Sequence, residues 1–249
     1  MATVVLLRHA RSTANGSGVL AGRSPGVELD ETGRKQADAL VARLATVPLA
    51  EIVCSPLLRC EQTVAPLAAA RGLAPATEPN LSEVDYGDWT NRELKDLAKE
   101  KLWTVVQAHP SAAVFPGGEG LANVQTRAVA AVRAHDARIT AEHGPGAVWL
   151  LCSHGDVLKA ILADALGQHL DTFQRIVVNP ASVSVVQYTE TRPFVLRMND
   201  NGGELASIVP PPPKPAESQD GSQDGPQPAE PDGIRPGDAV PGGVPGRAS

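Results

Sequence analysis

The chain lacks the features that mark several large classes of protein. No apolar run approaches the roughly 18 to 20 residues of a membrane-spanning helix, and no basic segment leading into a short apolar one near Met1 suggests a secretory signal. Basic residues are outnumbered, with 22 Lys and Arg against 28 Asp and Glu, so the basic face of a nucleic-acid-binding protein is not expected. We therefore expect a cytoplasmic protein with neither nucleic acid nor membrane as a partner.

Cysteine is also scarce. The three cysteines, Cys54, Cys60 and Cys152, are an odd number and lack the spacing of a metal site. Two of them lie in or beside apolar runs typical of buried strands. We expect reduced, partly buried thiols rather than a disulfide framework, as is usual inside cells.

Large apolar and aromatic residues nearly disappear after residue 209. Half of the 22 prolines lie in residues 210–249, among glycine, serine, glutamine and acidic residues. Such a segment cannot bury enough surface to offset the entropy of ordering it, so we expect 210–249 to be a disordered tail. The remaining 1–209 is long enough for one domain with a substantial core.

Within 1–209, strand and helix patterns alternate. This interleaving predicts a three-layer α/β/α sandwich with a largely parallel sheet. Ser55 and Pro56 indicate the N-cap and first position of a helix, and the pattern breaks down over 79–118, where we expect a cap. The predicted strands are 4–7, 51–54, 148–152, 183–188 and 194–196, the last at an edge, and the predicted helices are 32–44, 55–70, 119–139 and 157–167.

Two of these strands end in histidine-bearing turns, at Arg8-His9 and at Ser153-His154. The carboxyl ends of parallel strands share one edge of a sheet, where ligands bind. Arg59, just past the strand at 51–54, belongs to the same edge. Guanidinium groups match phosphate oxygens and stay charged at any working pH. Two arginines and two histidines therefore predict a phosphate site that needs no metal.

Phosphoryl transfer at such a site needs a nucleophile and an acid. A neutral imidazole presents one lone pair while its other nitrogen is held by a hydrogen bond, but spacing does not decide between His9 and His154. The leaving alkoxide needs a proton. Residues 81–89 offer three carboxylates for this role, and the residues alone do not choose among Glu83, Asp85 and Asp88.

Six short segments, in order, resemble the histidine phosphatase superfamily, in the branch that contains cofactor-dependent phosphoglycerate mutases and small bacterial phosphatases. The R-H-G-x-[ST] signature corresponds to 8–12 and S-[DP]-L-x-R to 55–59. The L-x-E-x-x-[FY]-G-x-W stretch corresponds to 81–89 and P-G-G-E to 116–119. S-H-G falls at 153–155 and N-x-[AG]-[SI] at 179–182.

The resemblance implies a phosphoglycerate mutase-like fold and hydrolysis of a small-molecule phosphomonoester. It implies that His9 becomes the phosphohistidine and that Glu83 acts first as acid and then as base. It also implies no cofactor and no metal, and it leaves a homodimer open, since members of the family are often dimers. By the same resemblance, the phosphate pocket is completed by Arg8, Arg59 and His154 and lined by Asn15 and the backbone of Gly22.

Ala10 departs from the family, which usually has glycine there. A position that needs positive φ would make alanine cost on the order of 1 kcal/mol, and the methyl group could crowd the nucleophile. We expect alanine to be tolerated. A non-catalytic phosphate-binding relative is one alternative.

A phosphoglycerate mutase-type phosphotransfer is the other alternative. Mutases of the family carry a long insertion after the acid and a pair of arginines for the substrate carboxylate. Here about 35 residues separate Glu83 from Glu119, and no Arg-Arg pair occurs. Residues 84–118 hold four of the eight aromatics, which form either a wall for a larger substrate or packing of the cap. A phosphatase is favoured.

Two other enzyme classes fit poorly. Cys54 to Arg59 is one residue short of the C-x₅-R loop of cysteine phosphatases. Ser153 lies on a strand–turn–helix like a nucleophile elbow, but Leu151 replaces the first glycine of G-x-S-x-G.

Overall fold

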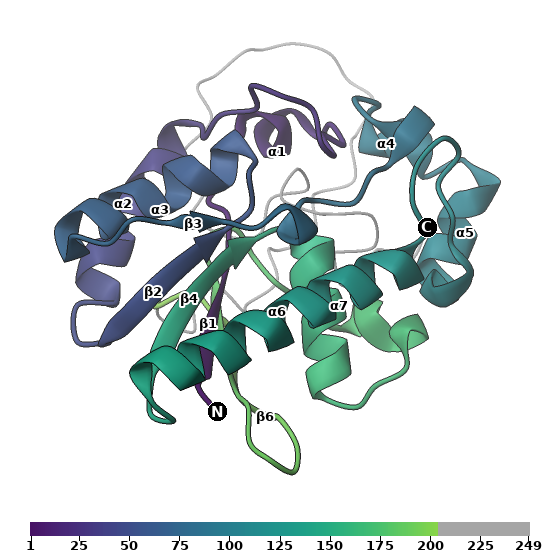
Figure 1. The fold of residues 1–249 in the computed structure, drawn as a ribbon. Coiled ribbons are helices and arrows are strands. Elements are labelled where there is room, and N and C mark those ends of the chain that lie inside the picture. The colour runs from purple at the N-terminus through teal and green to yellow at the C-terminus, as the bar shows by residue number, and fades with distance from the viewer. Residues whose placement is uncertain (204–249) are drawn as a thin grey trace.

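A computed structural model describes residues 1–203 of the chain. Its centre is one six-stranded sheet with the order β3-β2-β4-β1-β5-β6 (Figure 1). The pairs β1·β4, β2·β4 and β2·β3 are parallel, and β1·β5 and β5·β6 are antiparallel. The strands are β1 (Thr3–Arg8), β2 (Leu49–Cys54), β3 (Ala76–Thr77), β4 (Val148–Ser153), β5 (Val183–Gln187) and β6 (Phe194–Asp200).

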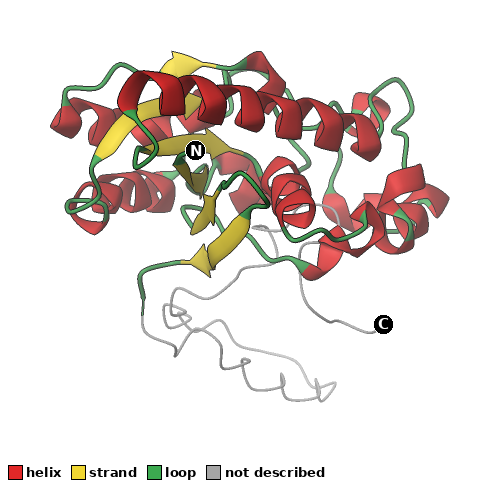
Figure 2. Cartoon of the chain, turned by 60° about the horizontal axis from the view of Figure 1, so that its bottom comes forward, coloured by secondary structure: helices red, strands yellow, loops and turns green. Residues whose placement is uncertain are grey.

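Helices cover both faces of the sheet, as the sequence predicts (Figures 1 and 2). Alternate residues of β1 point to opposite faces: Val5 and Leu7 pack under α2 and α3, and Val4 and Leu6 pack under α6 and α7. The three-layer α/β/α expectation is confirmed. The helices of these layers are α2 (Glu31–Arg43), α3 (Leu58–Arg71), α6 (Leu121–His143) and α7 (Gly155–Ala165).

The segment between β3 and α6 holds short elements rather than sheet. Three of its four aromatic side chains form core rather than a substrate wall: Tyr86, Trp89 and Phe115 are 0 to 3% exposed. The fourth, Trp103, is partly buried and packs against this core. The Tyr86 and Trp89 rings meet Phe115 edge-on, with ring centres 4.9 and 5.3 Å apart. The elements are η1 (Pro79–Leu81), η2 (Gly87–Trp89), α4 (Leu94–Leu97), α5 (Lys101–Ala108) and η3 (Pro110–Ala112); elsewhere in the chain are α1 (Thr13–Ser17) and η4 (Leu170–Arg175).

Helix α3 starts later than the sequence predicts. α3 begins at Leu58, and Leu57 occupies the N-cap position without a side-chain cap bond. Ser55 and Pro56 lie before the helix, which leaves the Ser55 hydroxyl for another partner. The late strands and the edge position of β6 are confirmed. The tail predicted for 210–249 lies outside the described residues.

Within the described residues, no helix is long and apolar enough to cross a membrane. All three cysteines are free and buried, as expected from their number and setting.

Candidate active site

The parallel pairing of β1 with β4 brings the two histidine turns together. Arg8 lies opposite Ser153 at the ends of these strands, and the His9 amide donates to the Ser153 carbonyl at 2.9 Å. The next residues are therefore neighbours: the ring centres of His9 and His154 are 5.2 Å apart. Both histidines are buried.

The first turn fixes the tautomer of His9. Its Nδ1 lies 2.8 Å from the Ala10 carbonyl, which only accepts, so Nδ1 carries the hydrogen and Nε2 carries the lone pair. Burial, followed by the charges of Arg59 and Arg8, lowers the pKa of His9 well below its usual value. A neutral ring with a free lone pair is the form that a nucleophile needs.

Ala10 fits this turn without backbone strain. Among the described non-glycine residues, positive φ occurs only at Asn91, Ala181 and Asn199. Alanine at position 10 therefore carries no conformational free-energy cost from a positive φ. Its methyl group is fully buried in a small cluster with Leu29, Ala37 and Ala181. The Ala10 amide donates to Thr63 Oγ1 of α3 at 2.9 Å, which ties the turn to the helix that carries Arg59.

Arg59 joins the two turns to a third segment. Its Nη2 donates to the Gly22 carbonyl at 2.8 Å and to His154 Nδ1 at 3.1 Å. Its Nη1 is buried without a hydrogen-bond partner. A buried guanidinium nitrogen left unpaired is costly unless an anion occupies the space it faces.

The contact from Arg59 fixes the tautomer of His154 as well. Because Nδ1 accepts from Arg59, Nε2 carries the hydrogen and donates to Ser55 Oγ at 2.8 Å. Ser55 is fully buried, and sequence reasoning missed it because a Ser-Pro pair also marks a helix N-cap. Burial, then Arg59, lowers the pKa of His154 well below its usual value.

Glu83 faces the histidines from the segment after η1. It is 5% exposed, its Oε1 accepts from the Val84 amide at 2.9 Å, and its Oε2 lies 4.0 Å from His154 Nδ1. Burial and then the charge of Asp156 raise its pKa to about 7, against the opposing charge of Arg59. A carboxyl that keeps its proton near neutral pH is suited to act as a general acid.

Three hydrogen bonds hold the Glu83 loop in place. Ser153 Oγ donates to the Leu81 carbonyl at 2.7 Å, which links the loop to the end of β4. The carbonyl of Glu83 accepts from Arg23 Nε at 2.8 Å and from Arg127 Nη2 at 3.2 Å.

The P-G-G-E turn at 116–119 also contacts this loop. The Glu119 carboxylate accepts from the Asp85 amide at 2.9 Å and pairs with Arg23 and Arg127. Gly118 is needed because a Cβ there would lie 2.2 Å from the Asp85 carbonyl oxygen. The motif therefore supports the segment that carries the candidate acid.

The two remaining predicted site residues have structural partners. Asn15 Oδ1 accepts from the backbone and hydroxyl of Ser12 as part of the capping box of α1. Gly22 has φ of +52° and receives Arg59 on its carbonyl; a Cβ on it would lie 3.1 Å from the Tyr86 ring. Gly22 thus reaches the site through its backbone.

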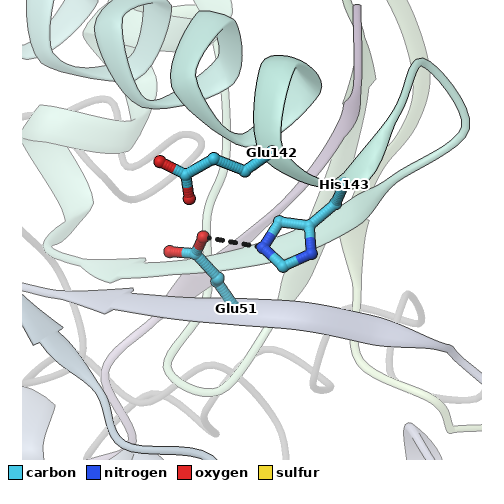
Figure 3. A group of neighbouring side chains, drawn as sticks. All are labelled: Glu51, Glu142 and His143. Atoms are coloured by element: carbon cyan, nitrogen blue, oxygen red, sulfur yellow. Dashed lines mark hydrogen bonds and ion pairs between the residues drawn. The ribbon is translucent and has the colours of Figure 1, made fainter.

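A second cluster of potential metal ligands lies away from this site. Glu51 of β2 meets Glu142 and His143 at the end of α6, and Figure 3 shows His143 bonded to Glu51. Arg138 already pairs with both carboxylates, at 2.6 and 2.8 Å. Arg138 offsets part of the negative charge of the cluster, which ties α6 to β2 as an ion-pair network.

Comparisons with known proteins agree with this geometry. Phosphoserine phosphatase 1 of Hydrogenobacter thermophilus is 30% identical over 207 residues, covering 80% of this chain and 92% of that protein. A Yersinia pestis protein named "Probable phosphoglycerate mutase GpmB" is 30% identical over 193 residues, covering 77% and 87%. The alpha-ribazole phosphatase from Shigella flexneri superposes with a TM-score of 0.69 at 25% identity, over 80% of this chain and 96% of that structure.

These likenesses extend over most of the described chain. The sequence profile of the histidine phosphatase superfamily (branch 1) matches residues 4–201, which include every candidate site residue and all six strands except Thr3 at the start of β1. The chain belongs to the histidine phosphatase superfamily, branch 1.

Proposed function

We propose that this protein is a metal-independent phosphatase that hydrolyses a small phosphomonoester through a phosphohistidine on His9. The observation that carries the proposal is the convergence of Arg8, His9, Arg59 and His154 at one edge of the sheet. The phosphatases among its relatives support the reaction class.

In the first step, the lone pair of His9 Nε2 attacks phosphorus and the bond to the ester oxygen breaks. Glu83 gives its proton to the leaving alkoxide. The guanidinium groups of Arg8 and Arg59 hold the phosphoryl oxygens and offset their charge. The neutral His154 accepts from Arg59 through Nδ1 and so holds that guanidinium in the pocket. Asn15 and the Gly22 backbone complete the lining.

In the second step, ionised Glu83 takes a proton from water. The water oxygen attacks phosphorus, the phosphorus–nitrogen bond breaks, and inorganic phosphate leaves. His9 returns to its neutral form and Glu83 regains its proton, so the cycle needs only the ester and water.

The central test is hydrolysis of a chromogenic phosphate ester in the presence of EDTA, comparing wild type with His9→Ala. We expect an active wild type and an inactive variant. Comparable rates would refute the nucleophile assignment. Phosphate labelled in the ester should become attached to wild type alone, and an absence of both label and turnover would leave a non-catalytic phosphate binder.

Glu83→Gln tests the acid separately. Loss of a general acid typically costs about 10² to 10⁴-fold in rate, and the loss should be large for alkyl phosphates and small for activated aryl phosphates, whose leaving groups need no proton. An equal loss for both would contradict the acid role.

The mutase-named relative makes phosphotransfer the second candidate. Incubation with 3-phosphoglycerate and 2,3-bisphosphoglycerate separates the two activities. We expect free phosphate; isomerisation without phosphate release would replace the hydrolase assignment.

A further inference from the structure

Three buried polar side chains beside Glu83 have no role in the steps above. Asp156, in the first turn of α7, accepts from the Tyr86 hydroxyl at 2.8 Å, and Lys159 Nζ lies 3.4 Å from its other oxygen. Asp156, Tyr86 and Lys159 are each at most 1% exposed. Burying an ion pair this deeply rarely adds stability, so the arrangement calls for another explanation.

The hydrogen bond between Tyr86 and Asp156 connects the loop that carries Glu83 to the start of α7, the helix that follows His154. Tyr86 lies three residues after Glu83 on the same loop, and Asp156 lies two residues after His154. The Tyr86 ring is fixed by its edge-on contact with Phe115 at 4.9 Å. The contact therefore sets the acid loop against the helix that follows His154.

We propose that Asp156 is a positioning residue for Glu83: through Tyr86 it fixes the acid loop on α7, and its negative charge keeps the proton on Glu83 until the leaving group takes it. The inference rests on the proposed function, because it assigns a purpose to the proton of the candidate acid.

Asp156 opposes the positive charges around Glu83. Arg59 and Arg8 lower the pKa of Glu83, whereas burial and Asp156 raise it. Lys159 supplies the counter-charge to Asp156 and is held on its far side by Gln174 and by the Phe173 ring, 4.6 Å from Nζ. The cationic or imidazole groups near Glu83, taken together, are Arg8, Arg23, Arg59, Arg127, His154 and Lys159.

The test is the pH dependence of kcat/KM for an alkyl phosphate, measured on the full chain. The wild type should lose activity as pH rises through the pKa of Glu83. Asp156→Asn keeps the shape and an acceptor for Tyr86 but removes the charge, so this fall should move to lower pH by about one unit, typical of a nearby charge. Tyr86→Phe keeps the charge and should lower kcat without moving the fall to lower pH.

Asp156→Asn leaves the ammonium of Lys159 buried without a counter-charge. The double variant Asp156→Asn with Lys159→Met removes both charges and serves as the variant less exposed to misfolding. The fall should still move to lower pH, because Asp156 is the neighbouring charge with the largest effect on the pKa of Glu83. The shift should be smaller than in Asp156→Asn, since Lys159 carries a positive charge that also acts on Glu83.

A direct readout separates this inference from the proposed function. The infrared band of the protonated Glu83 carboxyl, identified by its loss in Glu83→Gln, is titrated without substrate; it should ionise at lower pH in the Asp156 variants. Active wild type with an unchanged Glu83 titration in the variants would overturn the inference alone. Wild type that hydrolyses no phosphomonoester would overturn the proposed function, whatever the titration shows.

Discussion

At the scale of single residues, the folded protein keeps a proton on the Glu83 carboxyl, and this lowers its stability near neutral pH. Its pKa is raised to about 7 by burial and by Asp156, whereas a glutamate in an unfolded chain titrates near 4.3. Between these values the unfolded chain releases the proton and the folded chain keeps it. The free energy of unfolding therefore falls as pH rises through this window.

Glu83→Gln should remove this dependence, because glutamine does not ionise. The variant should match wild type in stability near pH 4 and exceed it at pH 8 by up to about 4 kcal/mol, since one pKa unit is worth about 1.4 kcal/mol. Urea denaturation at the two pH values measures the difference. A gain of equal size at both would contradict a raised pKa in the folded state.

The pKa of Glu83 and the pKa values of the two neighbouring histidines are shifted in opposite directions. Burial and the arginines lower the pKa values of His9 and His154, so neither would compete with Glu83 in the proposed donation of a proton to the leaving group. Glu83 is the group whose pKa lies near neutrality, which is where an acid that later acts as a base works best.

At the scale of elements, the candidate site lies where strand ends are followed by turns and helix starts. The end of β1 supplies Arg8 and His9, and α3 supplies Arg59. The turn of Gly118 and Glu119 braces the acid loop between the sheet and α6. It does so through backbone contacts so close that a single methyl group would not fit.

Gly118→Ala tests this bracing. A Cβ at this position would lie 2.2 Å from the Asp85 carbonyl and 2.7 Å from the Gly87 amide, so the acid loop must shift. We expect a loss of about 1–3 kcal/mol in stability, as is typical of overpacking, together with a lower kcat for alkyl phosphates.

Gly146→Ala is the matched control. A Cβ there has no atom within 4 Å, so stability should stay within about 0.5 kcal/mol of wild type and activity should not change. If both variants behaved alike, the contact at Gly118 would not support the acid.

At the scale of the whole molecule, the candidate site residues lie between Arg8 and His154, well before the end of the described chain at residue 203. The six strands end at Asp200, and the family match ends at residue 201. Among the described residues, the loop before β5 also reaches the site, because the Val178 carbonyl accepts from Arg8 Nη1 at 2.7 Å.

A chain truncated after Gly203 should therefore keep its kcat/KM and its midpoint of thermal unfolding. Both are measured against the full chain, with the same chromogenic ester and by calorimetry. Loss of activity with an unchanged midpoint would show that residues 204–249 take part in catalysis or substrate binding.

The sequence by itself determined the parts of the site whose signals are local. A strand followed by a polar turn is encoded within about ten residues, so the runs before His9 and His154 predicted both the sheet layer and the shared edge. The alternation of strands and helices likewise predicted three layers. Ordered motifs, carried by resemblance, selected Glu83 among the three carboxylates of its loop.

Only the tertiary structure decided which of these segments touch. The insertion of β4 between β1 and β2, the bond from Ser55 to His154 and the tie from Tyr86 to Asp156 join residues 70 or more positions apart. In the sequence, Ser55 resembled the N-cap of a helix. The aromatic residues of segment 84–118 fitted the wall of a substrate pocket as well as they fitted a packed core. Local patterns do not distinguish these roles, because the partner that settles each one arrives from another part of the chain through packing.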